Sequence, residues 1–319
     1  MSVIAGLSER GHDTYVFDQK TKRNKKIAKK LKNSFSKLIW GDIRDYSLLE
    51  KSVADCDCII HLAAIVLPES EINKNDCDEV NIGGTDNIIK AALSAENNIP
   101  IVYVSSASVI GPTQDEQPPV NASVLPNPTS YYAKSKLEAE KRVMASGLDY
   151  CILRLASVMD SSSDYSEDML KLLFEFPLDG RTEIILDSDA AMAIVVSAEK
   201  ISNDSKIKDK VLFIGGGSKN GCQITNREMI GRMFTAMGIG MLSEECFTTD
   251  FSQYSMDWYD TKEGNEFLNY QNHSYEDYIK IIEKKTESGG LFVKYMAPRL
   301  KSAMELQSPY YKKTKNPEE

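Results

Sequence analysis

The sequence predicts an α/β protein built on a doubly wound parallel sheet. Short runs of β-branched or aromatic residues alternate with segments whose apolar residues recur at helical spacing. This alternation is typical of repeated strand-helix-strand units, in which helices cover both faces of a parallel sheet. The chain has 319 residues, of which 42% are hydrophobic, so it is long enough for one large domain with a smaller lobe.

Each element is predicted from its own pattern. The predicted strands of the first half are 14–17, 37–40, 58–62, 101–105 and 150–153. Two helices, 78–95 and 131–146, carry apolar residues at helical spacing, and the second follows a Pro-Asn-Pro-Thr turn. Beyond Met159 an acidic, serine-rich stretch precedes mixed helix and strand fragments, including a strand at 211–214 that ends in three glycines.

Composition excludes several classes of partner. The net charge of −9 argues against nucleic acid, so a small-molecule substrate is the expected partner. No stretch reaches the roughly 18 to 20 consecutive apolar residues that span a bilayer, and residues 1–18 do not resemble a signal peptide. We therefore expect a cytoplasmic protein with no membrane partner. The six cysteines and three histidines lack metal-binding spacing, so no metal is predicted.

The strongest chemical signal lies at the start of the second helix. Tyr132 and Lys136 are four residues apart, which places the phenol and the ammonium on one helical face. A nearby positive charge lowers the pKa of a phenol and makes its proton transferable. The pair alone also fits a solvated helix face. Ser106, however, follows a strand at the sheet edge where ligands bind, so we predict that the three residues act on one substrate oxygen.

Further short motifs occur in a fixed order over residues 3–285. They are Arg10-Gly11-His12, Phe17-Asp18, Gly41-Asp42-Ile43-Arg44-Asp45, His61-Leu62-Ala63-Ala64, Val80-Asn81, the stretch 105–111, and Tyr132 to Lys136. Each motif is weak alone, but the ordered set is specific. On these motifs the chain resembles the extended short-chain dehydrogenase/reductase family, which includes NAD-dependent epimerases and dehydratases.

The resemblance implies roles for individual residues. Tyr132 matches the general acid/base, Lys136 the lysine that holds the nicotinamide ribose, and Ser106 the hydroxyl that positions the reacting oxygen. Asp18 matches the carboxylate that binds the adenosine ribose and would repel a 2′-phosphate, so NAD is expected and NADP is less favoured. An ordinary turn carboxylate is the alternative for Asp18. The other implied cofactor contacts are Asp42, Ile43, Leu62, Ala63, Ala64 and Asn81, the last with structural hydrogen bonding as an equal alternative.

One family feature has no match in the sequence. The GxxGxxG turn that follows the first strand is absent, and counting back from Gly11 places its last glycine immediately before Met1. We expect the loss of that strand to leave strand edges unpaired, and the loss of the turn to weaken cofactor binding. The favoured interpretation is a shortened form of a working enzyme; the alternative is a natural variant that no longer turns over.

The resemblance also implies an architecture and a reaction. It implies a Rossmann-like sheet lacking its first strand over residues 1–160, a smaller substrate lobe over 161–295 whose elements partly return to the core, and a C-terminal tail over 296–319. The implied function is NAD(P)-dependent hydride transfer on a nucleotide sugar or another small hydroxy or carbonyl compound, as an epimerase or reductase. Ala107 and Ser108 replace the Asp-Glu pair of 4,6-dehydratases, so dehydration is not expected.

Two further expectations concern assembly and activity. The helices 78–95 and 131–146 match the pair through which family members associate, so a homodimer is implied. The alternative to an active enzyme is a catalytically impaired Rossmann-like protein that binds a nucleotide or regulates a partner, and the missing turn favours it.

Overall fold

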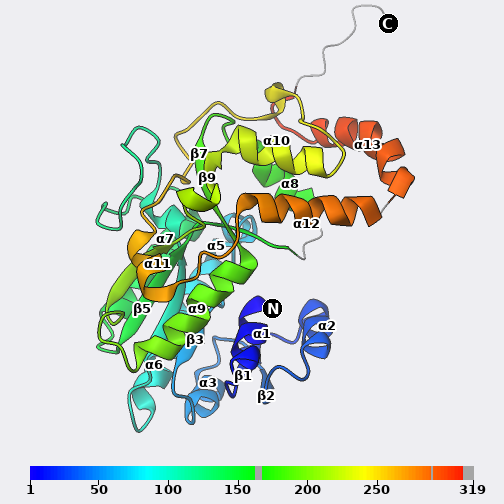
Figure 1. Ribbon diagram of the computed structural model, residues 1–319. Helices are drawn as coiled ribbons and strands as arrows, with labels where there is room; N and C mark the ends of the chain where they lie inside the picture. The colour runs from blue at the N-terminus through cyan, green and yellow to red at the C-terminus, as the bar shows by residue number, and fades with distance from the viewer. Residues whose placement is uncertain (162–166, 289, 312–319) are drawn as a thin grey trace, which may run out of the picture.

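The computed structural model describes residues 1–161, 167–288 and 290–311, which form two lobes (Figure 1). The lobe that contains the N-terminus holds the parallel strands with helices on both faces. The other lobe contains the helices α8 (Glu167–Phe174), α10 (Asn226–Ala236), α12 (Tyr275–Ser288) and α13 (Gly290–Glu305). This arrangement confirms the predicted α/β class with a parallel sheet.

The central sheet has four parallel strands in the order β3, β4, β5, β8. Their bounds are β3 (Ile59–His61), β4 (Ile101–Ser106), β5 (Tyr150–Leu155) and β8 (Lys210–Ile214). Each strand lies within two residues of its predicted position, because the β-branched runs that predict them also form the buried centre of the sheet.

A second, smaller parallel sheet contains β1 (Tyr15–Asp18) and β2 (Lys37–Trp40). Within the described residues it shares no ladder with the central sheet, so β1 and β3 each have one edge without a strand partner. The unpaired edges agree with the expectation from the sequence. The helix α1 (Ser2–Glu9) connects the β1–β2 sheet to the rest of its lobe. Ser2 Oγ donates a hydrogen bond to Asp187, and Arg10, which follows the helix, forms an ion pair with Glu199.

Helices cover the two faces of the central sheet. The helices α3 (Tyr46–Val53), α6 (Gly84–Ser94) and α7 (Tyr131–Met144) pack on one face, and α9 (Asp187–Ile201) and α11 (Lys262–Leu268) pack on the other. Ile101 and Tyr103 lie in the hydrophobic core on the side of α3, α6 and α7, and Val102 lies in the core on the side of α9 and α11. Successive side chains of a strand point to opposite faces of the sheet, which explains this alternation. The predicted helix 78–95 is divided, because a π-helical turn, Asp78–Gly83, precedes α6.

Shorter elements complete the chain. The helices α2 (Lys22–Lys30), α4 (Glu69–Ile72) and α5 (Lys74–Cys77) precede the π-helical turn. Beyond β5, a three-stranded sheet joins β6 (Ser157–Met159), β7 (Arg181–Leu186) and β9 (Gln223–Thr225), with β6 parallel and β9 antiparallel to β7.

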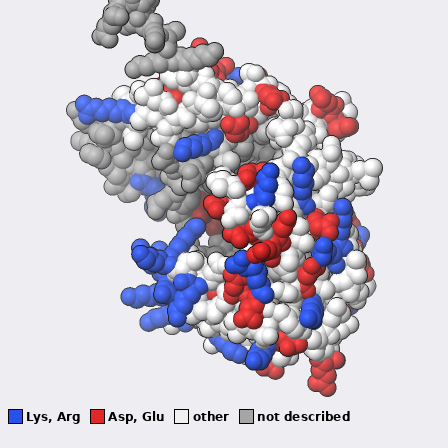
Figure 2. Space-filling view, turned by 180° about the vertical axis from the view of Figure 1, so that it is seen from behind, with Lys and Arg blue, Asp and Glu red and all other residues white. Residues whose placement is uncertain are grey.

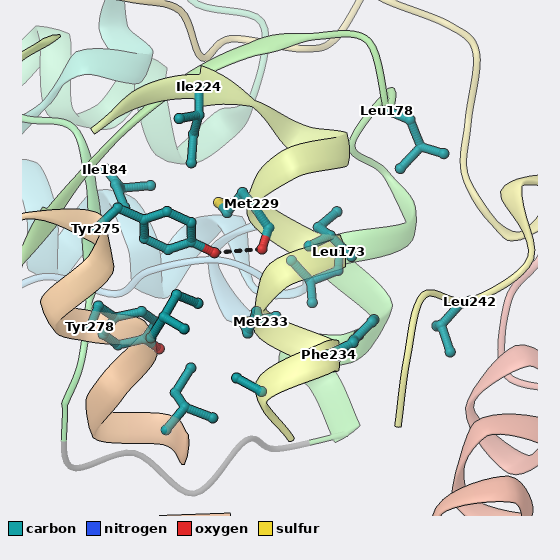
Figure 3. Close-up of a cluster of buried hydrophobic side chains, with 14 of the residues drawn as sticks. Leu173, Leu178, Ile184, Ile224, Met229, Met233, Phe234, Leu242, Tyr275 and Tyr278 are labelled. Carbon is teal, nitrogen blue, oxygen red and sulfur yellow. Dashed lines mark hydrogen bonds between the residues drawn. The ribbon is translucent and has the colours of Figure 1, made fainter. Parts of the chain in front are cut away.

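The second lobe has its own hydrophobic core. Figure 3 shows side chains of α8, α10 and α12 converging there, and the buried Tyr275 hydroxyl donates a 2.6 Å hydrogen bond to the carbonyl oxygen of Met229. Helix α13 runs through Pro298, so residues 296–305 are helical where a tail was predicted; residues 312–319 lie outside the described part. No helix among the described residues combines the length and apolar character needed to cross a bilayer.

Candidate active site

Ser106 is fixed at the carboxyl end of β4. The chain leaves the strand through a 3-10 turn, Ala107–Ile110, and Ser106 Oγ accepts a 3.2 Å hydrogen bond from the Ser108 N–H. The hydroxyls of Ser106 and Ser108 also share a 2.8 Å hydrogen bond. The turn closes at Gly111, where φ is +80° and a Cβ atom would lie 1.9 Å from the Asn127 carbonyl oxygen. Glycine is therefore required there, and the turn holds the Ser106 hydroxyl in place.

Tyr132 lies in the first turn of α7. Ser130 caps this helix by accepting a 3.1 Å hydrogen bond from the Ala133 N–H, and the Tyr132 N–H donates to Glu71 Oε1 at 3.0 Å. Burial raises the pKa of Tyr132 to about 12, and the nearby Ser106 hydroxyl opposes the shift. The structure thus brings Ser106 and Tyr132 together. The expected lowering of the Tyr132 pKa by Lys136 is wrong, because desolvation dominates.

Lys136 lies one helical turn further along α7 and is buried beneath β4. Its Nζ donates a 2.6 Å hydrogen bond to the Val104 carbonyl oxygen and lies 4.2 Å from the centre of the Tyr103 ring. Burial lowers the pKa of Lys136 to about 7, and the nearby Glu140 carboxylate opposes this shift. Lys136 is therefore close to the sheet terminus that carries Ser106, but it is not a permanently charged group at neutral pH.

Behind Lys136 lies an ion pair that the sequence analysis did not find. Glu140, one further turn along α7, accepts hydrogen bonds from Arg154 Nε at 3.0 Å and from Arg154 Nη2 at 2.7 Å. The side chains are 0% and 5% exposed. The sequence does contain a sign of this pair: Glu140 lies on the same helical face as Tyr132 and Lys136, and Arg154 is a charged residue in an otherwise apolar strand. The carboxylate is thus the charged group that supports the ammonium form of the lysine.

The depressed pKa of Lys136 predicts a pH dependence of stability. Between about pH 7 and 10.5, the ordinary pKa of a lysine, the unfolded chain binds a proton at this residue that the folded chain does not. The unfavourable contribution of Lys136 to the free energy of unfolding is therefore relieved as the pH rises. In urea titrations we expect the stability of the wild type, relative to Lys136→Met, to increase from pH 7 to pH 10. Titrating groups that do not interact with Lys136 cancel in this comparison. Parallel pH profiles of the two proteins would contradict the depressed pKa.

The residues expected to contact the cofactor lie mostly along the carboxyl ends of the strands. After β3, Leu62 is 47% exposed, Ala63 is exposed and Ala64 is half-buried. Asp18, at the end of β1, is exposed and accepts hydrogen bonds through Oδ1 from the Gln19 N–H at 2.7 Å and from Asn24 Nδ2 at 3.0 Å. Small accessible apolar groups and an accessible carboxylate fit the ring faces and ribose hydroxyls of a dinucleotide.

Asp42 and Ile43 have mainly structural contacts. Arg44 donates to both carboxylate oxygens of Asp42, at 3.0 Å and 2.8 Å, and these hydrogen bonds lower the pKa of Asp42 to about 2. Ile43 is buried against α6, where a Cβ atom on Gly84 would lie 2.6 Å from Ile43 Cγ2. The close approach of α6 to this loop therefore requires glycine at position 84.

Asn81 connects the loop after β3 to α7. Its Oδ1 accepts a 2.7 Å hydrogen bond from the Ile65 N–H, while its Nδ2 donates to the Ile65 carbonyl oxygen at 3.0 Å and to Ser135 Oγ at 2.9 Å. Of the two roles left open for Asn81, these contacts describe the structural one. It positions both the exposed apolar loop and the helix that carries Tyr132.

Comparisons with known proteins agree with this geometry. The chain aligns with a UDP-glucose-4-epimerase from Stenotrophomonas maltophila solved with NAD and formylated UDP-arabinopyranose, with a TM-score of 0.73 and 17% identity over 90% of this chain and 94% of that one. It also aligns with a dTDP-glucose 4,6-dehydratase from Streptomyces venezuelae, with a TM-score of 0.68 and 21% identity over 90% of this chain and 92% of that one. At these identities the likeness concerns the fold.

Sequence relatives cover a shorter part of the chain. Short-chain dehydrogenase/reductase family 42E member 1 of Macaca fascicularis is 38% identical over 117 residues, which are 34% of this chain and 29% of that protein. Methionine adenosyltransferase 2 subunit beta of Bos taurus is 30% identical over 118 residues, 37% of this chain and 34% of that protein. The matched part thus spans about a third of the length of these curated relatives.

The fold and the ordered motifs define an extended short-chain dehydrogenase/reductase, as the sequence predicted. The model of the 3-beta hydroxysteroid dehydrogenase/isomerase family matches residues 2–169, more than half of the chain. The chain belongs to that family.

Proposed function

We propose that the protein is an NAD-dependent epimerase or reductase acting on a small hydroxy or carbonyl compound. The observation that carries this proposal is the proximity of the Ser106 hydroxyl to the Tyr132 phenol at the carboxyl end of β4, with Lys136 bonded to the same strand at Val104. A hydroxyl and a phenol that meet at a strand terminus are suited to hold and protonate one substrate oxygen.

The residues have distinct tasks in this proposal. Ser106 orients the substrate oxygen by hydrogen bonding, and Tyr132 gives or takes the proton of that oxygen. Because the pKa of Tyr132 is raised to about 12, the phenol is protonated at neutral pH and first serves as the acid, in the direction that reduces a carbonyl. Bound NAD would supply the hydride-exchanging ring. Asp18 would bind the adenosine ribose, and Leu62 to Ala64 would face the cofactor.

We base the proposed substrate class on the proteins to which the chain is similar. The aligned epimerase was solved with a nucleotide sugar, and the matching family is named for hydroxysteroids. Both compounds carry a secondary hydroxyl that a Ser-Tyr pair could hold. We propose a nucleotide sugar first, because the aligned epimerase shares its fold over 90% of this chain.

A second candidate function is a nucleotide-binding regulatory subunit. Its specific support is that one group of relatives is named as a subunit of methionine adenosyltransferase. The two candidates differ in turnover: both bind a nucleotide, but only the enzyme interconverts an alcohol and a ketone.

Cofactor binding tests both candidates. In fluorescence titrations we expect NADH to bind more tightly than NADPH, because the Asp18 carboxylate repels a 2′-phosphate, and Asp18→Asn should reduce this preference by roughly ten-fold. The matched control is Asp55→Asn, an exposed carboxylate in the loop after α3. The titration is repeated on the chain preceded by a strand and a GxxGxxG turn. No binding of either nucleotide in both forms would refute the proposed cofactor.

A further inference from the structure

One segment carries a charge opposite to that of the whole protein. Residues 19–41 hold nine of the 38 basic residues and none of the 47 acidic ones. We call these nine residues the α2 basic surface: Lys20, Lys22, Arg23, Lys25, Lys26, Lys29, Lys30, Lys32 and Lys37. The remainder of the chain is consequently more acidic than the net charge of −9 indicates.

The structure places all nine side chains on the outside. Helix α2 begins after Thr21, whose Oγ1 accepts a 3.0 Å hydrogen bond from the Asn24 N–H. Its apolar side chains, Ile27, Ala28 and Leu31, are partly buried over a cavity that β1 and β2 also line. The basic side chains therefore occupy the opposite face, and all nine are exposed. Figure 2 shows them gathered at the left edge, where α2 projects.

Internal partners do not neutralise this surface. Among the residues that the structure describes, none of the nine forms an ion pair with a carboxylate; Lys37 lies 5.2 Å from the centre of the Tyr15 ring. The Debye length at physiological ionic strength is about 8 Å, so the distant acidic residues do not cancel the local field. Like charges this close repel one another, and an external polyanion would relieve that repulsion.

We propose that the α2 basic surface binds the protein to an anionic phospholipid bilayer, which replaces the expectation from the sequence that there is no membrane partner. Eight of the nine residues are lysines, whose compact charges suit a diffuse layer of headgroups, whereas arginine is favoured for bidentate recognition of nucleic acid. The aromatic residues of the segment, Phe35 and Trp40, are partly buried and line the cavity under α2, so they are not presented for base stacking. The acidic remainder is repelled by the same bilayer, which leaves α2 as the contact.

The test is co-sedimentation of the full chain with vesicles. We expect binding to phosphatidylcholine vesicles that contain phosphatidylserine, none to phosphatidylcholine alone, and loss of binding when NaCl is raised from 0.1 to 0.5 M. The variant K25Q/K26Q/K29Q/K30Q should bind at least about a hundred-fold more weakly, because each lysine near a bilayer contributes to the attraction.

The matched control removes four exposed lysines elsewhere, in K141Q/K206Q/K219Q/K262Q. This control has the same net charge as the α2 variant and should keep most of the binding. Equal losses in the two variants, or no binding of the wild type to anionic vesicles, would overturn the proposal. So would tighter binding of an RNA hairpin or a DNA duplex than of the vesicles at the same salt. Thermal unfolding should be similar in all three proteins, since the replaced side chains are exposed.

Discussion

Tyr132→Phe is expected to lower turnover about 10²- to 10⁴-fold, the range that a positioned proton donor contributes. The phenol is the group that meets Ser106 at the strand terminus, and phenylalanine keeps the ring but removes the transferable proton. Turnover is measured with NAD and a panel of nucleotide sugars and hydroxysteroids. Oxidation of the alcohol is followed as the appearance of NADH absorbance, and epimerisation, which leaves NAD unchanged overall, by chromatographic separation of the two epimers. The affinity for NADH should change little, because the hydroxyl exchanges the substrate proton.

The control for this prediction is Tyr131→Phe. The Tyr131 hydroxyl bonds to Asp78 Oδ2 at 2.6 Å rather than to Ser106, so its loss should leave turnover nearly unchanged. If Tyr132→Phe retained full activity while Tyr131→Phe lost it, the assignment of the acid/base would be wrong. If the wild type, with bound NAD, turned over none of the panel, the regulatory candidate would be favoured instead.

Removing one partner of the Glu140–Arg154 pair is expected to destabilise the fold by about 3–5 kcal/mol, because the remaining charge would be buried without a partner. Arg154→Met removes both hydrogen bonds that the structure gives the Glu140 carboxylate, which is 0% exposed between α7 and β5, and leaves it only the more distant Lys136 as a charged neighbour. The free energy of unfolding is measured by urea titration. The double variant Glu140→Gln with Arg154→Met should recover part of the loss, since it leaves no unpaired charge.

The comparison for this prediction lies on the same helix. Glu138 pairs with Arg142 at 3.2 Å on the exposed side of α7, and Glu138→Ala should lower the stability by about 0–1 kcal/mol. A loss of this small size in Arg154→Met would contradict the prediction and would indicate that water reaches the buried pair.

The sequence predicted the central strands because these depend on local pattern, whereas it predicted the meeting of Ser106 and Tyr132 from the rule that ligand-binding groups gather at strand ends and from the family resemblance. A run such as 101–106 is strand-like on its own residues, and its end is marked by Ser106 and Gly111. The division of the helix at Gly83 and Gly84 was not predicted, since helical periodicity continues through the π-helical turn. The helix α13, which runs through Pro298, was not predicted either; proline inside a segment gives no sign that a helix continues through it.

The electrostatics of the site could not be predicted in the same way. The pKa values of Tyr132 and Lys136 depend on how deeply the two side chains are buried, which is a tertiary property. Glu140 and Arg154 lie on different elements, and no local signal pairs them. The α2 basic surface was missed because a net charge averages over the whole chain and conceals a local excess of the opposite sign.

The division between β1 and β3 implies that the protein does not open as one cooperative unit. The backbone amides of β4 and β5 are bonded on both sides within four strands, so they are released only when the central sheet unfolds. The ribbon of β1 and β2 has only its own ladder, and separating it requires no break in that sheet. Hydrogen exchange in this ribbon would therefore report a local opening with a free energy below the global one, and Asp18, at the end of β1, would share that lower protection.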